Sequence, residues 1–210
     1  MDWKERLRAA GVVPVVKLKD IDQAEALSDA LCEGGIPCAE ITFRAAGAAE
    51  VIRRMGARHP EMLIGAGTVL TVAQAKEALD AGAAFIVAPG TNPRVVEYVL
   101  QRDGVMLPGV MTPTEIEAAM GYGLDTLKFF PAEAAGGIKM LKSFAGPYAG
   151  VRFVPTGGIT PENLADYLTL PGVLACGGTY IAPEKLLQAG DFAAVTEICR
   201  KTVQAAAKAR

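Results

Sequence analysis

The chain has 210 residues, of which 51% are hydrophobic and 21% charged, and its formal net charge is only −2. This composition excludes a disordered chain and offers no electrostatic match for a polyanion, so we expect no nucleic-acid partner. No apolar run approaches the roughly 18 residues that a membrane span needs, and the charged first residues contain no signal-peptide core. We therefore expect a cytoplasmic protein without membrane association.

The cysteines and the single histidine argue against metal chemistry. Cys32, Cys38, Cys176 and Cys199 show no CxxC spacing, and His59 precedes a proline at the expected end of a helix. We therefore predict free thiols, a surface position for the histidine and no metal site.

Eight short apolar runs, each following a glycine that ends a helix-like stretch, predict eight strands. In chain order they are residues 12–18, 38–43, 62–68, 84–89, 105–110, 126–132, 151–158 and 173–179. The runs lack a clean alternation of apolar and polar residues, which is typical of parallel strands buried on both faces. The segments between them show the apolar spacing of amphipathic helices.

Eight strand and helix units predict a small (β/α)8 TIM barrel, whose usual length begins at about 200 residues. A short amphipathic helix in MDWKERLRAAG precedes the first strand. The alternative is an open doubly wound sheet, but no GxGxxG turn follows the first strand as that fold would favour. We find no linker, so residues 1–210 are expected to form one α/β barrel domain.

In such a barrel the active site lies at the carboxyl ends of the strands. Lys128 is the most unusual residue there, because it lies within the apolar run TLKFFPA. Burying an ammonium is costly, and burial favours the neutral amine that can form an imine. Alternatively, Lys128 extends its ammonium into solvent at the rim of the barrel. Lys17, at the end of the first run, competes for the role, although its more polar neighbours favour a cation that binds an anionic substrate.

Two further charged residues lie near the end of the second predicted strand. Glu40 lies in the apolar run CAEITF, where a carboxylate needs a partner or a function. It either pairs with a buried cation or acts as a general acid and base beside a lysine nucleophile. Arg44 suits a forked contact with a carboxylate or phosphate, or is a solvated arginine of the next turn.

Glycine pairs follow the last two predicted strands. Gly157 and Gly158 follow the seventh, and Gly177 and Gly178, succeeded by Thr179, follow the eighth. Phosphate sites in these barrels often form at these two strands, and glycines let backbone amides approach the anion closely. We therefore predict a phosphate site. The small residues of the GAG segment before Thr68 are expected to make room for substrate.

The motifs EITFR, GAGTV, APG, LPGVMTPTE, LKFFPAE and PTGGI, with the glycine pair at Gly177, resemble those of the 2-keto-3-deoxy-6-phosphogluconate (KDPG) aldolase family. The similarity covers almost the whole chain, and LKFFPAE followed by PTGGI is its most specific part. The resemblance implies a class I aldolase that cleaves KDPG, a keto-acid phosphate, to pyruvate and D-glyceraldehyde 3-phosphate. It also implies a homotrimer, no metal or other cofactor, and, as in many members, cleavage of 4-hydroxy-2-oxoglutarate.

Position by position, the resemblance implies that Lys128 forms the imine and that Glu40 moves protons through a bound water. It further implies that Arg44 and Thr68 hold the pyruvyl carboxylate. Pro89 and Phe130 would line the pocket around the imine, and Thr156 would contact a substrate hydroxyl. The residues implied to hold the phosphate are Gly157, Gly158, Gly177, Gly178 and Thr179. Members often have Ser-Trp where this chain has Thr179-Tyr180. This departure from the family pattern is expected to affect phosphate affinity and pocket shape, and not the imine chemistry.

Other functions stay open from the sequence. The nearest is a sister aldolase that acts on the 6-phosphogalactonate epimer or mainly on hydroxy-oxoglutarate. A sugar-phosphate isomerase and a non-catalytic sugar-phosphate-binding barrel belong to different classes. Neither explains a desolvated Lys128 beside Glu40 as directly.

Overall fold

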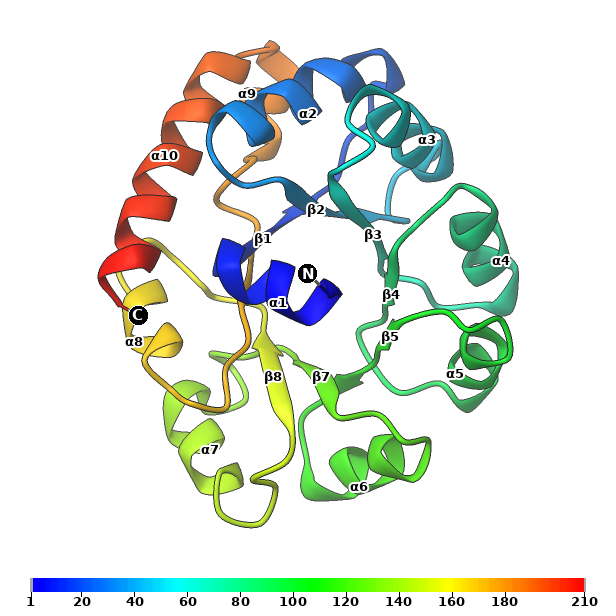
Figure 1. The fold of residues 1–210 in the computed structure, drawn as a ribbon, viewed down its shortest axis with the longest axis vertical. Helices are drawn as coiled ribbons and strands as arrows, with labels where there is room; N and C mark the ends of the chain where they lie inside the picture. Colours follow the sequence, from blue (N-terminus) through cyan, green and yellow to red (C-terminus); the bar gives the residue numbers. More distant parts are fainter. Residues whose placement is uncertain (1, 210) are drawn as a thin grey trace.

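The computed structural model describes residues 2–209, in which strands and helices alternate along the chain (Figure 1). The strands are β1 (Val12–Val16), β2 (Cys38–Thr42), β3 (Leu63–Gly67), β4 (Phe85–Val87), β5 (Met106–Leu107), β6 (Gly109–Val110), β7 (Thr126–Phe129), β8 (Arg152–Pro155) and β9 (Cys176–Gly178). The helices are α1 (Trp3–Ala10), η1 (Ile21–Gln23), α2 (Ala24–Glu33), α3 (Ala48–Arg58), α4 (Val72–Asp80), α5 (Pro93–Leu100), α6 (Pro113–Gly121), α7 (Gly137–Phe144), α8 (Leu164–Leu168), α9 (Glu184–Ala189) and α10 (Phe192–Lys208).

The strands form a closed parallel barrel, which confirms the predicted architecture. Six of them pair in the order β5-β4-β3-β2-β1-β9 and three in the order β6-β7-β8. Parallel bridges between Phe153 and Val173 and between Thr156 and Gly177 join β8 to the β9 segment and complete the ring. Figure 1 shows α2 to α10 around the outside of the strands and α1 across the middle of the ring. Helices outside and side chains inside bury both faces, which explains why the strands read as continuous apolar runs.

The fifth predicted strand is divided by Pro108. Proline has no backbone N–H to donate to a neighbouring strand. Before it, β5 pairs with β4, and after it β6 pairs with β7. The carbonyl of Pro108 still accepts a hydrogen bond of 2.9 Å from the backbone N–H of Lys128. The ring therefore remains continuous although two separate sheets are defined.

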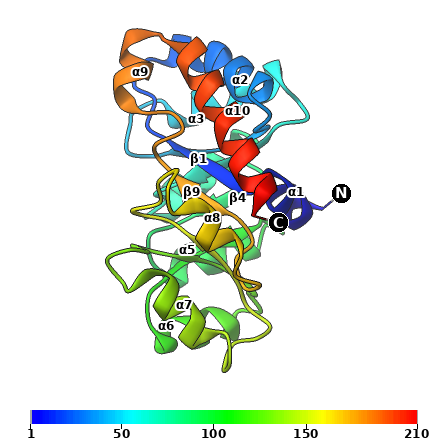
Figure 2. The ribbon, with the colours of Figure 1, turned by 90° about the vertical axis from the view of Figure 1, so that its left-hand side faces the viewer.

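Helix α1 closes the end of the barrel that lies opposite the carboxyl ends of the strands. The Asp2 carboxylate caps its first amides, and Gly11 ends the helix with φ 71°. Leu7 is fully buried and lines the barrel interior with Val13 and Phe85. Figure 2 shows α1 at one end of the barrel. The predicted N-terminal helix is thus confirmed, and it covers one end of the barrel.

Two helices, α9 and α10, follow the last strand, where the repeating pattern predicts one. Helix α10 packs against α2, with Gly34 at the close approach, because a Cβ there would lie 2.2 Å from Cys199 Cβ. Within residues 2–209, the cysteines form no disulfide with one another, and their side chains are half-buried at Cys32 and buried elsewhere. None of the helices in residues 2–209 is both long enough and apolar enough to cross a membrane.

Candidate active site

The central feature of the barrel interior is a buried ion pair between Lys128 and Glu40. Lys128 Nζ lies 3.2 Å from Glu40 Oε1, and the two side chains are only 7% and 5% exposed. The residues are 88 positions apart and come from β7 and β2, which are not neighbours in the barrel. The Lys128 amine also lies 5.4 Å from the centre of the Phe130 ring. An amine and a carboxylate so close together out of solvent can exchange a proton directly.

Around this pair lies a cavity of about 200 Å³ at the carboxyl ends of the strands. Its wall contains eleven of the twelve residues that the sequence singled out. They are Glu40, Arg44, Thr68, Pro89, Lys128, Phe130, Thr156, Gly157, Gly158, Gly177 and Thr179. Val15 and Ile159 also line it. The alternation of Val13 and Val15 into the interior along β1 is a signal that could have identified Val15.

The twelfth predicted residue, Gly178, does not line the cavity. A Cβ on Gly178 would lie 2.9 Å from the Tyr180 ring, whereas one on Gly177 would lie 2.3 Å from Thr156 Oγ1. Gly177 therefore lets β9 approach β8 at the cavity wall, and Gly178 accommodates Tyr180. The Tyr180 ring thus packs against Gly178, which does not line the cavity.

The GAG segment has a different role from the one predicted. A Cβ on Gly65 would lie 2.2 Å from the Phe85 ring, and one on Gly67 would lie 2.1 Å from Glu40 Oε1. The prediction that these glycines make room for substrate is therefore wrong. They make room for two side chains of the barrel interior, one of which is the buried carboxylate.

Arg44 and Thr68 lie on the rim of the cavity beside the buried pair. Arg44 Nε donates to Thr42 Oγ1 over 3.3 Å, and the Thr42 hydroxyl donates to Val16 O over 2.8 Å. This chain of bonds holds the guanidinium at the end of β2. Thr68 has φ 55°, a left-handed conformation that is costly for a β-branched residue and is typical of functional sites.

The turn after β8 presents glycines in the conformation that only glycine adopts easily. Gly157 has φ 99° and Gly158 has φ 83°. Their carbonyls accept hydrogen bonds from Glu133 N and Asn163 Nδ2, respectively, over 3.1 and 2.9 Å. The neighbouring Thr156 is buried and lines the cavity. Such a turn favours an anion at the backbone amides that face the cavity.

Lys17, the competing lysine, lies outside this cavity. Its Nζ lies 3.7 Å from Glu184 Oε2, and the same carboxylate binds Lys19 at 2.5 Å. The side chain of Lys17 is 33% exposed. The structure therefore separates the two lysines clearly, with Lys128 desolvated and Lys17 in a surface ion cluster.

A larger cavity of about 450 Å³ lies at the amino ends of β8 and β9, next to α7. Its wall is mostly apolar, and its charged side chains are Lys142 and Arg152. Its lining contains no carboxylate and no buried lysine, so this cavity lacks the side chains that acid–base or imine chemistry needs. The smaller cavity around Lys128 is the candidate active site.

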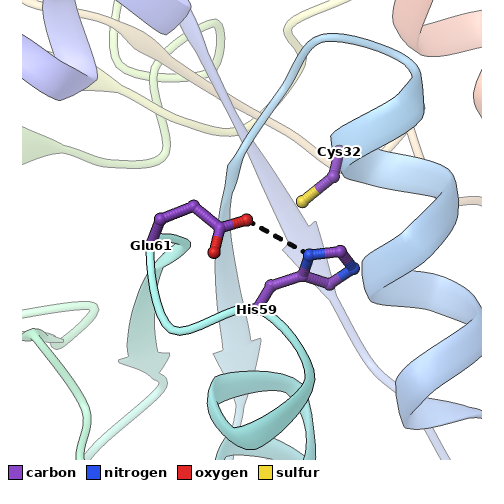
Figure 3. Close-up of side chains that lie close together, drawn as sticks. All are labelled: Cys32, His59 and Glu61. Carbon is purple, nitrogen blue, oxygen red and sulfur yellow. Dashed lines mark hydrogen bonds and ion pairs between the residues drawn. The ribbon is translucent and has the colours of Figure 1, made fainter.

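His59 follows α3 and lies in a polar cluster beside Cys32 and Glu61 (Figure 3). Its Nδ1 lies 3.2 Å from Glu61 Oε1 and its Nε2 lies 2.7 Å from Asp29 Oδ1. Cys32 is the third member of a Cys-His-Glu group within the described residues. Burial raises the pKa of the Cys32 thiol to about 11, and nearby carboxylates contribute to the rise. With the Cys32 thiol protonated and the imidazole hydrogen-bonded to Asp29 and Glu61, this cluster connects α2 to the end of α3.

The fold and the site together define a (β/α)8-barrel enzyme. The sequence model of the KDPG and KHG aldolase family matches residues 3–198. Over 200 residues the chain is 48% identical to 2-dehydro-3-deoxy-phosphogluconate aldolase from Treponema pallidum, with 95% of each chain covered. The chain therefore belongs to the KDPG and KHG aldolase family, whose members are lyases.

Two solved structures are similar over nearly their whole length. The KDPG aldolase of Legionella pneumophila matches with a TM-score of 0.92 at 36% identity, covering 96% of this chain and 98% of that one, and holds pyruvate as a covalent carbinolamine intermediate. The 2-keto-3-deoxy-6-phosphogluconate aldolase of Zymomonas mobilis, with 3-phosphoglycerate, matches with a TM-score of 0.88 at 37% identity, covering 96% and 94%.

Proposed function

We propose that this protein is a class I aldolase that cleaves KDPG to pyruvate and D-glyceraldehyde 3-phosphate through an imine on Lys128. The observation that carries the proposal is the buried Lys128 amine 3.2 Å from the Glu40 carboxylate, at the open end of the barrel. Imine formation requires a neutral amine, and the adjacent carboxylate can accept the proton of the ammonium. The covalent pyruvate adduct of the Legionella pneumophila relative supports the same chemistry.

The reaction follows from these two groups. The Lys128 amine attacks the C2 ketone of the substrate, and Glu40, through a water, moves the protons that convert the carbinolamine to a cationic imine with loss of water. Removal of the proton from the C4 hydroxyl breaks the C3–C4 bond. The bonding electron pair passes to the imine nitrogen and leaves an enamine on Lys128 and glyceraldehyde 3-phosphate. Protonation of the enamine at C3 and hydrolysis of the imine release pyruvate.

The remaining groups of the cavity position the substrate. Arg44 and Thr68 at the rim suit the pyruvyl carboxylate, because a guanidinium and a hydroxyl can both donate to it. Pro89 and Phe130 form walls around the imine, and the Thr156 hydroxyl can contact a substrate hydroxyl. The chemistry moves electron pairs through the imine, so the proposal requires no redox cofactor and no metal.

The phosphate is proposed to bind at the glycine turns, with Gly157, Gly158, Gly177 and Thr179 on the cavity wall and Gly178 behind it. The complex of the Zymomonas mobilis relative with 3-phosphoglycerate supports a phosphate-bearing substrate. Binding energy from a remote phosphate helps orient the reacting carbons, so the substrate without phosphate should lose turnover as well as affinity. Equal turnover of both substrates at saturation would contradict this role.

The proposal is tested by incubating the protein with pyruvate and borohydride, which reduces an imine to a stable adduct. Peptide mass spectrometry should find one pyruvate on the peptide that contains Lys128. Lys128→Met should abolish both the adduct and KDPG cleavage. Lys17→Met is the matched control, because it removes a lysine that is partly exposed at the end of β1 and lies outside the cavity. An adduct that survives in Lys128→Met, or full activity of that variant, would overturn the proposal.

Substrate range and assembly are proposed from the family resemblance. We expect cleavage of 4-hydroxy-2-oxoglutarate as a second activity, and comparison of turnover on it, on KDPG and on the galactonate epimer tests the choice. We also expect a cytoplasmic homotrimer. Light scattering coupled to size exclusion measures the mass in solution, and a monomer would contradict the expected assembly.

A further inference from the structure

Three consecutive carbonyls at the turn after β8 are held by donors from other segments. Thr156 O accepts from Ala132 N over 2.8 Å, and Gly157 O accepts from Glu133 N over 3.1 Å. Gly158 O accepts from the side-chain Nδ2 of Asn163 over 2.9 Å. All three carbonyls of this turn are thus bound to the body of the protein.

Fixing a carbonyl also fixes the amide of the following residue. A trans peptide unit is planar, so its C=O and N–H point in opposite directions. The three anchored carbonyls therefore orient the amides of Gly157, Gly158 and Ile159 away from their anchors. These three residues line the cavity that contains Lys128. Successive amides held in this way form the concave arrangement that binds anions.

Glu133 is itself held in place by Tyr167. The Tyr167 hydroxyl donates to Glu133 Oε1, and the tyrosine is fully buried. Burial and the neighbouring carboxylate raise the pKa of the Tyr167 phenol, so it stays a donor. The side chain of Glu133 lies directly under the turn, because a Cβ on Gly158 would lie 2.5 Å from Glu133 Cγ. The aliphatic part of Glu133 thereby supports the turn from below while its backbone N–H binds the turn's carbonyl.

Asn163 completes the support from the other side. Its Oδ1 accepts from Thr160 N over 2.9 Å while its Nδ2 donates to Gly158 O. One amide side chain therefore connects the end of the glycine turn to the segment that leads into α8. The turn is thus anchored by residues that do not line the cavity themselves.

We propose that Glu133, Tyr167 and Asn163 are positioning residues that hold the backbone amides of Gly158 and Ile159 in the orientation that binds the phosphate of the substrate. The proposal rests on the proposed function, which identifies the anion as a sugar phosphate. Each hydrogen bond to a charged group contributes enough that loss of its alignment weakens binding about tenfold. The three residues therefore govern the preference for phosphorylated over unphosphorylated substrate, without contact with either.

Tyr167→Phe removes only the hydroxyl that holds Glu133, and Asn163→Ala removes the other anchor. In each variant the KM for KDPG and the inhibition constant of inorganic phosphate should rise about tenfold. The kcat/KM for 2-keto-3-deoxygluconate, which lacks the phosphate, and the rate of pyruvate trapping by borohydride should stay at the wild-type value. Tyr148→Phe is the matched control, because its hydroxyl also donates to a glutamate, Glu117, over 3.0 Å.

The glutamate gives a second, conservative comparison. Glu133→Gln retains an oxygen that can accept from Tyr167, so it should bind phosphate as well as the wild type does. Glu133→Ala removes both the acceptor and the support under Gly158 and should behave like Tyr167→Phe. This contrast separates a positioning role from a role of the negative charge, because both substitutions remove the charge.

The outcomes distinguish the two proposals. Equal losses on phosphorylated and unphosphorylated substrates, or unchanged phosphate inhibition in folded Tyr167→Phe and Asn163→Ala, would overturn the positioning role. If the wild-type protein forms no pyruvate adduct and cleaves no aldol substrate, the proposed function fails instead. Calorimetric titration with inorganic phosphate then still measures whether the variants weaken the anion site, and it decides the positioning role separately.

Discussion

Substituting Gly67 by alanine adds one methyl group beside the Glu40 carboxylate, which we propose to be catalytic. The new Cβ would lie 2.1 Å from Glu40 Oε1 and 2.5 Å from its Cγ. The backbone of Gly67 is not in the left-handed region, so alanine introduces no backbone strain. The effect of this substitution is therefore confined to the position of Glu40.

The size of the effect follows from these distances. Ordinary van der Waals contact begins at 3.4 Å, so the oxygen must move by about 1.3 Å, the difference between 3.4 and 2.1 Å. Displacing a catalytic group by about 1 Å costs on the order of 100-fold in rate. Overpacking a core costs roughly 1–3 kcal/mol, which lowers the melting temperature by roughly 2–12 °C in a protein of this size.

The assay measures kcat for KDPG cleavage and the rate of borohydride trapping of pyruvate. Both should fall by about 100-fold in Gly67→Ala. Gly56→Ala is the control, because it adds the same methyl within α3, where the nearest atom, Ile64 Cδ1, is 3.9 Å away. It should keep full activity and gain about 0.4–1 kcal/mol of stability. A folded Gly67→Ala with wild-type kcat would refute the argument that the position of Glu40 governs turnover.

Two further predictions concern stability. Leu7→Ala should lower the free energy of unfolding by about 2–5 kcal/mol, because Leu7 is fully buried where α1 closes the barrel. Arg8→Ala is the control, because Arg8 is exposed and its removal should change the free energy of unfolding little. Urea denaturation measures both variants, and similar values for the two would contradict the role of α1. The hydrogen bond from Arg58 lowers the pKa of Asp29, so this carboxylate stabilises the fold above its unfolded pKa of about 3.9 and ceases to do so as the pH falls through its lower folded value. Asp29→Asn should therefore cost up to about 1 kcal/mol at pH 7, with the difference from wild type disappearing in acid unfolding; a gap that is constant with pH would contradict this.

The positions of the strands could be predicted because they depend on local patterns. Each of the eight apolar runs contains a strand of the structure, and only Pro108 divides one of them. The glycine before the third run does not end a helix as predicted, because Gly56 lies within α3. The glycine turn at Gly157 was also recognisable, because its positive φ requires glycine. The sequence did not reveal why glycine is required at Gly65 and Gly67. Their neighbours, Phe85 and Glu40, belong to other strands, and no local pattern reveals such contacts.

The sequence by itself determined the periodic alternation of strands and helices, because glycine, proline and apolar spacing act within a few residues along the chain. It also marked Lys128 and Glu40 as unusual, because each interrupts an apolar run. Only the tertiary structure decided that Lys128 rather than Lys17 is desolvated, since that depends on which side chains fill the closed barrel. Closure of the barrel likewise brings Tyr167 to Glu133 and Glu40 to Lys128, since these contacts form between segments 34 and 88 residues apart.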